Sequence, residues 1–235
     1  MAEPIASGIV PRLDRPGGNI TGFASFEATL GGKWLELLLE IAPGLKRAAI
    51  MANPDTAPTL AYRPSLETAA RSLKVVPITA LVHSDVEIET AISALGREPG
   101  GGLVVMPDAF TIAHHTPIIS AAARNNVPAV YALSLSVKDG GLLSYAPDLV
   151  DNFRRTASYV DRILRGAKPA ELPIQLPTKL GGLLPIEWVI FRNLDVIPVF
   201  DDNTLANRWS LLSAAPRRGR VRAPIGLIRE PRLTN

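Results

Sequence analysis

Three short apolar runs decide the fold of this chain: AAIMA at residues 48–52, LVVM at 103–106 and AVY at 129–131. Each run is continuous, whereas a strand with one solvent-exposed face alternates apolar and polar residues. Continuous runs are typical of parallel strands in a sheet that helices cover on both faces. The fold class that they predict is α/β.

Amphipathic helix-like segments alternate with these runs, and the strand-helix unit recurs roughly every 25 to 28 residues. Strands are expected at 48–52, 75–79, 103–106, 129–131 and 141–145, and helices at 33–42, 59–73, 85–96, 118–124 and 148–165. A proline-rich connector follows at 169–178, and beyond residue 180 the alternation of strands and helices ends.

The segment 148–165 is the most regular amphipathic helix of the chain. Its apolar residues recur at steps of three and four, which places them on one stripe of a helix. These residues are Val150, Phe153, Ala157, Val160, Ile163 and Leu164. Such a stripe needs a partner surface, so self-association through this helix is one expectation.

The composition excludes several classes of protein. Hydrophobic residues make up 47% of the chain and charged residues 20%, which is typical of a globular protein rather than a disordered or fibrous one. Because there is no cysteine, disulfides and thiolate chemistry are excluded. No apolar run reaches the roughly 18 residues of a membrane-spanning helix, and the N-terminal residues lack the pattern of a signal peptide. As written, the chain is expected to stay in the cytoplasm.

The net charge of +3 is unevenly distributed along the chain. Residues 201–235 hold seven arginines and three acidic residues, whereas residues 1–200 hold 18 basic and 19 acidic residues. The Arg, Pro and Gly of residues 216–235 are typical of a disordered tail. The basic charge therefore belongs to the tail, and we expect no nucleic-acid partner.

Motifs for catalysis and for phosphate binding are missing from the sequence. There is no nucleophile elbow, no HExxH zinc motif, no P-loop and no GxGxxG motif. His114 and His115 are adjacent, so on a helix they point about 100° apart and cannot bind one metal as an i, i+4 pair would. We expect no catalytic residue, no metal site and no cofactor.

Residues that follow the expected strands are candidate ligand-binding groups, because an open α/β sheet binds its ligand beyond the carboxyl ends of its strands. The candidates are Asn53, Asp55, Thr56, Asp108, Ala109, Ser134 and Tyr145. The alternative is structural: the Asn-Pro-Asp and Pro-Asp sequences would only cap the helices that follow them.

Five segments together resemble the substrate-binding proteins of ABC transporters, in particular the tryptophan/tyrosine-type family. They are DRPGGNITG (14–22), GKWLELL (32–38), PAVY (128–131), GGLLSYAPD (140–148) and YVDRILRGAKPAELP (159–173). The resemblance implies the type I periplasmic-binding-protein fold, with two Rossmann-like lobes, a cleft between them and three crossings at a hinge. It also implies a small-molecule solute, such as an aromatic amino acid or aromatic acid, an ABC permease as partner and a periplasmic location.

The resemblance divides this chain into four parts. Residues 1–23 would be a remnant of the first lobe with a hinge crossing, and residues 24–135 a nearly complete second lobe. Residues 136–179 would be a returning helix of the first lobe with a hinge connector, and residues 180–235 a divergent, partly disordered tail. Family sequences usually carry a signal peptide and most of the first lobe before RPGGNITG, so a truncated member is expected.

Two functions of other classes stay open. The first is a cytoplasmic ligand-sensing or interaction module of the same fold, whose basic tail could neutralise phosphates of a nucleic acid. The second is an enzyme of flavodoxin-like architecture, although no paired acid and base supports it.

Overall fold

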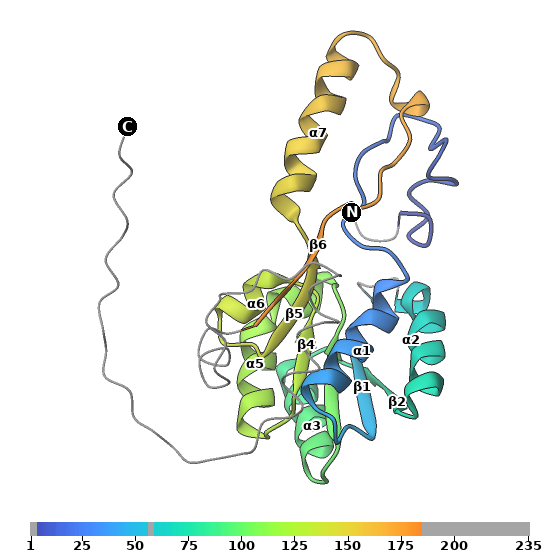
Figure 1. The fold of residues 1–235 in the computed structure, drawn as a ribbon. Helices are drawn as coiled ribbons and strands as arrows, with labels where there is room; N and C mark the ends of the chain where they lie inside the picture. Colours follow the sequence, from blue (N-terminus) through green and yellow to red (C-terminus); the bar gives the residue numbers. More distant parts are fainter. Residues whose placement is uncertain (1–3, 56–58, 185–235) are drawn as a thin grey trace, which may run out of the picture.

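The structure is a computed structural model that describes residues 4–55 and 59–184. A six-stranded sheet in the order β2-β1-β3-β4-β5-β6 lies between two layers of helices (Figure 1). The strands are β1 (Arg47–Ala52), β2 (Val76–Leu81), β3 (Gly101–Val105), β4 (Ala129–Tyr131), β5 (Leu143–Pro147) and β6 (Leu180–Leu183). The first five strands are parallel and β6 is antiparallel to β5. The predicted α/β class is confirmed.

The helices follow the predicted order. They are α1 (Leu30–Ile41), α2 (Thr59–Leu73), α3 (Asp85–Gly96), α4 (Ala109–Ala113), α5 (His115–Arg124), α6 (Ser134–Lys138) and α7 (Leu149–Leu164), with a 3-10 turn at Pro169–Glu171. The predicted bounds of α2 and α3 are confirmed, whereas the short helices α4 and α6 were not predicted. In the part of the chain that the structure describes, no helix is both long and apolar enough to cross a membrane.

Two hydrophobic cores lie on opposite faces of the sheet. Trp34 of α1 and Leu66 of α2 belong to one core, and Ile92 of α3 and Ile118 of α5 belong to the other. Both cores form because successive side chains of a strand point to opposite faces: Leu103 of β3 joins the second core, while its neighbours in sequence contact the first. Helices therefore cover the continuous apolar strands on both faces of the sheet.

Close contact between α1 and α2 depends on a glycine. A Cβ atom at Gly31 would lie 2.7 Å from Ser65 Oγ and 3.0 Å from the carbonyl oxygen of Tyr62. Only a residue without a side chain lets the two helices approach this closely. Trp34, one turn further along α1, is fully buried, and its Nε1 donates a hydrogen bond to the carbonyl oxygen of Tyr145 at 2.8 Å.

Helices were expected to cover both faces of every strand, but β2 is largely exposed. It is the edge of the sheet, and five of its six residues are exposed, with Val76 at 60% and Leu81 at 48%. Pro77 within β2 has no backbone N–H, and proline in strands is largely confined to such edges. An apolar run alone does not distinguish an edge strand from a central one.

The strand β6 was not predicted: it begins at residue 180, beyond which the sequence indicates no further alternation of strands and helices. Leu183 pairs with Ser144 and Leu180 with Pro147, so β6 extends the sheet at the edge next to β5. Gly181 and Gly182 give this segment a low strand propensity, and pairing with β5 compensates for it. The rest of the expected tail, 185–235, lies outside the described residues.

The helix α7 rises from one end of the sheet and is flanked by two crossing segments of the chain (Figure 1). These segments lie side by side: Ala24 N–H donates to the carbonyl oxygen of Gln175 at 2.8 Å, and Gln175 N–H donates to that of Gly22 at 3.0 Å. Tyr159 of α7 contacts Phe23 in one of them, with ring centroids 5.0 Å apart. The segments expected as hinge crossings are therefore neighbours in space.

Candidate functional site at the carboxyl edge of the sheet

The carboxyl ends of β1 to β4 meet at one edge of the sheet because these strands are parallel. Asn53 and Asp55 follow β1, His83 follows β2 and Asp108 follows β3. The structure therefore brings together the predicted loops after β1 and β3 and the loop of His83, which was not predicted.

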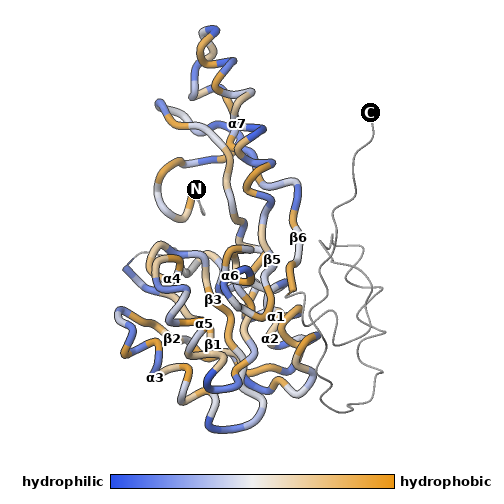
Figure 2. The backbone as a smooth tube through the Cα atoms, turned by 90° about the vertical axis from the view of Figure 1, so that its left-hand side faces the viewer, coloured by the Kyte–Doolittle hydropathy of each residue, from blue (hydrophilic) through white to orange (hydrophobic). Residues whose placement is uncertain are grey.

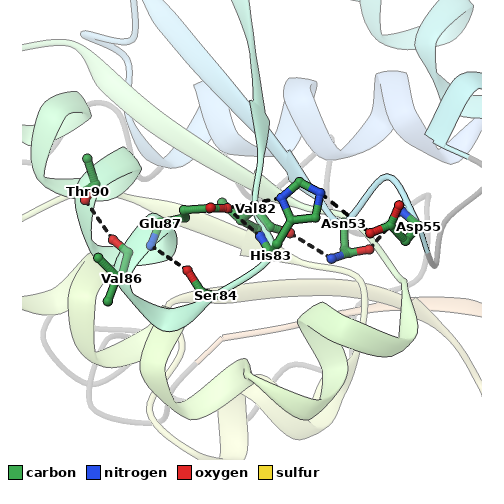
Figure 3. A network of polar contacts seen from close by, with 8 residues as sticks. All are labelled: Asn53, Asp55, Val82, His83, Ser84, Val86, Glu87 and Thr90. Atoms are coloured by element: carbon green, nitrogen blue, oxygen red, sulfur yellow. Dashed lines mark hydrogen bonds and ion pairs between the residues drawn. The ribbon is translucent and has the colours of Figure 1, made fainter.

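Asn53 is 5% exposed and joins two of these loops. Its side-chain Nδ2 donates to the carbonyl oxygen of Val82 at 2.9 Å, and its Oδ1 accepts from the N–H of Asp55 at 2.9 Å (Figure 3). Its backbone N–H donates to Asp108 Oδ2 at 3.0 Å. The side-chain amide of Asn53 is thus hydrogen-bonded to backbone groups of two neighbouring loops.

Asp108 is 2% exposed and caps α4. Its Oδ1 accepts from the N–H of Thr111 at 2.7 Å, while Oδ2 accepts from Asn53. Thr111 Oγ1 donates to the carbonyl oxygen of Met106 at 2.6 Å. Asp108 is therefore a helix cap, as the structural alternative predicted. Its carboxylate also links the end of β3 to the end of β1.

His83 was not among the predicted site residues, yet it is central to the exposed part of the edge. Its ring lies between two carboxylates, with Nδ1 3.2 Å from Glu87 Oε2 and Nε2 3.6 Å from Asp55 Oδ2 (Figure 3). The N–H of His83 also donates to Glu87 Oε2 at 2.6 Å. This backbone hydrogen bond and the one from the ring lower the pKa of Glu87. The Ser84-x-x-Glu87 pattern after β2 was the available sequence signal.

The other two histidines also contact carboxylates, but not the same ones. His114 Nδ1 lies 2.6 Å from Asp85 Oδ1, and His115 Nε2 lies 2.9 Å from Asp139 Oδ2. The adjacent histidines thus contact carboxylates in different places, on α3 and directly after α6. Across residues 4–55 and 59–184, no three histidine or carboxylate side chains are grouped as a metal ion would require.

An apolar hollow of about 20 Å³ opens at the ends of β3 and β4. Its lining includes Pro107, Ile112, His115, Leu133 and Leu135. Ile112 is 41% exposed and Leu135 is 51% exposed, so apolar surface faces solvent here. This apolar feature was not predicted, because the candidate residues at the strand ends were chosen mainly for their polar groups.

The remaining predicted site residues have different surroundings. Ala109 and Ser134 are the exposed first residues of α4 and α6, at the edge as expected. Tyr145 needs a correction: it is 1% exposed and belongs to the core next to α1 instead of the edge. The sequence did not specify to which face of the sheet the Tyr145 side chain points. The register of β5 places this side chain in the core that contains Trp34. Thr56 lies outside the described residues.

The sequence matches the model of the family described as ABC transporter substrate binding protein over residues 1–197. A relative of known function is a tyrosine-binding protein of Clostridioides difficile, 23% identical over 175 residues, or 74% of this chain and 50% of the relative. The chain thus spans about half the length of this curated relative.

Solved structures with the same fold include a conserved domain protein of Vibrio cholerae. It has a TM-score of 0.72 and 23% identity, over 87% of this chain and 67% of that one. An ABC domain from Streptococcus pneumonia in complex with L-Trp also has a TM-score of 0.72, with 20% identity over 87% of this chain and 69% of that one. These likenesses confirm the periplasmic-binding-protein fold.

Proposed function

Because the chain belongs to the family of ABC transporter substrate-binding proteins, we propose that it contributes to binding a small solute with an aromatic ring. The binding surface would be the carboxyl edge of the sheet. The family binds solutes and is not a class of enzymes, so the interaction needs no covalent chemistry: it combines removal of apolar surface from water with a few oriented hydrogen bonds.

The apolar hollow at the ends of β3 and β4 carries this proposal. Ile112 and Leu135 offer exposed apolar surface beside loops that Asn53 and Asp108 hold in place. An aromatic ring would cover both side chains and gain the free energy of their burial, about 25 cal/mol per Å². The names of the Clostridioides difficile and Streptococcus relatives, which refer to tyrosine and to L-Trp, support the aromatic class.

Polar recognition would come from the exposed groups of the same edge. Asp55 and Ser134 are exposed and flank the strand ends, and the first N–H groups of a helix have no partner within it. We assign Asp55, Ala109 and Ser134 to contacts with the polar part of the solute. Asn53 and Asp108 are positioning residues, because their side chains are bonded to backbone.

The hollow is much smaller than an aromatic ring, so a second wall is required. We propose that this wall belongs to the part of the fold that the relatives contain and this sequence does not span. Sequencing the DNA upstream of the gene tests this. An in-frame or near-frame first lobe supports a truncated copy, whereas an intact unrelated gene contradicts it.

Titration calorimetry of the 235-residue chain with L-tryptophan and L-tyrosine tests the binding, with L-leucine as the comparison ligand. We expect weak binding of the aromatic amino acids, and at least a tenfold loss in Leu135→Asp. Val76→Asp is the matched control, because Val76 is exposed to a similar extent, 60% against 51%, but lies in the edge strand β2. No heat from either aromatic ligand at millimolar concentration would contradict the proposal.

Members of this family work outside the cytoplasmic membrane, where they deliver solutes to an ABC permease. We infer the same location and partner for this chain, and co-purification with a permease encoded beside the gene would test the partnership. The alternative of a sensing module with a basic tail depends on residues 201–235, which lie outside the described residues.

A further inference from the structure

The helix α7 has one face seated on the rest of the chain. Tyr159 Oη donates to the carbonyl oxygen of Pro173 at 2.7 Å, and Asn152 Nδ2 donates to that of Ala24 at 3.3 Å. Asp151 accepts from Lys179 Nζ at 2.7 Å. These contacts tie α7 to both crossing segments, so the helix is held in place without help from its other face.

The other face of α7 is apolar and exposed to solvent. Phe153 is 76% exposed, Leu164 81%, Val150 67% and Val160 50%. Figure 2 shows hydrophobic and hydrophilic residues interleaved along this helix. The stripe expected from the sequence is thus present, and none of the described segments covers it.

The spacing of the stripe is that of a coiled-coil seam. Val150, Phe153, Ala157, Val160 and Leu164 follow one another at steps of three, four, three and four residues. These are the a and d positions of two heptads, which pack against an equivalent seam on another helix. Ala157, small and at the middle, lets the two backbones approach.

The charges beside the seam indicate which helix packs against it. Arg154 and Asp161 directly follow the two d positions Phe153 and Val160, so both flank the same side of the seam. In an antiparallel pair with its two-fold axis near Ala157, Arg154 lies level with the partner's Asp161, and the reverse pair is equivalent. In a parallel pair the two charges would instead face Leu149 and Thr156 of the other helix, which carry no charge. Flanking charges of this kind set partner and orientation.

We propose that two copies of this chain associate through their α7 helices, antiparallel and related by a two-fold axis. Such an interface is self-complementary, so one surface supplies both sides. The helix α7 has 16 residues and is about 24 Å long at 1.5 Å per residue, so the seam is short. Because α7 is already ordered by its contacts with the crossing segments, pairing does not have to form the helix first. Asp161 also contacts Arg165, directly after the end of α7 in the same chain, at 2.9 Å, and the partner's Arg154 would share this carboxylate.

Sedimentation equilibrium of the full chain over a range of concentrations tests the proposal. We expect a reversible monomer–dimer equilibrium, and a dissociation constant raised about tenfold or more in Phe153→Glu, because a charge would enter the apolar seam. The control is Val76→Glu, which places the same charge on an exposed apolar residue of the β2 edge and leaves the dimer intact. Circular dichroism shows whether each variant is folded.

A charge exchange gives the sharper test. Arg154→Asp places like charges opposite each other and weakens the dimer, and Arg154→Asp combined with Asp161→Arg restores it, because the pairs form again with opposite polarity. A monomer at every concentration would overturn the proposal and indicate that another partner, such as the lobe found in the relatives, covers the stripe. A dimer that Val76→Glu disrupts and Phe153→Glu does not would assign the contact to β2.

Discussion

The carboxylate of Asp108 accepts a hydrogen bond from the backbone N–H of Asn53, 3.0 Å away, and so joins the ends of two adjacent parallel strands. The same carboxylate caps α4. Both carboxylate oxygens accept hydrogen bonds from backbone N–H groups at this edge. These hydrogen bonds explain why an acidic residue is only 2% exposed there.

Replacement of Asp108 should destabilise the protein more than loss of an ordinary cap. In Asp108→Ala both the Asn53 and Thr111 N–H groups lose their acceptor, and we expect a loss of about 2 to 4 kcal/mol in the free energy of unfolding. Asp148→Ala is the control, because Asp148 caps α7 through a single bond to Asp151 N–H and is exposed. That variant should lose about 1 kcal/mol. Urea unfolding measures both, and equal losses would contradict a role of Asp108 across the strands.

A methyl group at Gly31 should destabilise the protein although alanine favours helices. Its Cβ would meet Ser65 Oγ at 2.7 Å and the Tyr62 carbonyl oxygen at 3.0 Å, so α1 and α2 would have to move apart. We expect Gly31→Ala to cost about 1 to 3 kcal/mol of unfolding free energy.

The neighbouring glycine provides the comparison for Gly31. At Gly32 the nearest atom to a Cβ is the Ser65 carbonyl oxygen at 3.3 Å. The gain in helix propensity, about 1 kcal/mol, then offsets much of the crowding. The melting temperature of Gly31→Ala should be clearly lower than that of Gly32→Ala. The reverse order would show that α1 and α2 move apart without loss of stability.

The contact between Lys179 and Asp151 should make stability depend on pH. The hydrogen bond from Lys179 lowers the pKa of Asp151 below its ordinary value of 3.8. A lowered pKa means that the stabilisation is present above the pKa of the unfolded chain and is lost as the pH falls through that of the folded protein. Lys179→Met should therefore lower the melting temperature at pH 7.

The difference between wild type and Lys179→Met should shrink as the pH falls below 4, since the carboxylate then becomes protonated in both proteins. Lys168→Met is the control, because it removes an exposed lysine outside this contact. Melting temperatures measured by circular dichroism from pH 7 to pH 3 give the comparison. A constant difference over this range would mean that Lys179 acts through packing of its alkyl chain.

Much of the fold follows from local patterns. The run AAIMA predicts β1, and Ser84 with Glu87 marks the start of α3, because a hydroxyl accepts the free N–H of the first helical turn. Candidate site residues were predicted less well. Strand order brings Asn53, Asp55, Asp108 and Ser134 to one edge, but which of them is free to meet a ligand depends on partners far away in sequence, such as the Asn53–Asp108 bond.

Local sequence patterns were enough for the α/β class, the order of the strands and longer helices through α7 and the apolar stripe of α7, because each depends on the periodicity of neighbouring side chains. Long-range packing determines which strand lies at the edge, that a segment with two glycines pairs as β6, that Tyr145 faces the core and that the α7 stripe stays exposed. These features depend on which distant segment supplies a hydrogen bond or an apolar surface, and no local pattern records that choice.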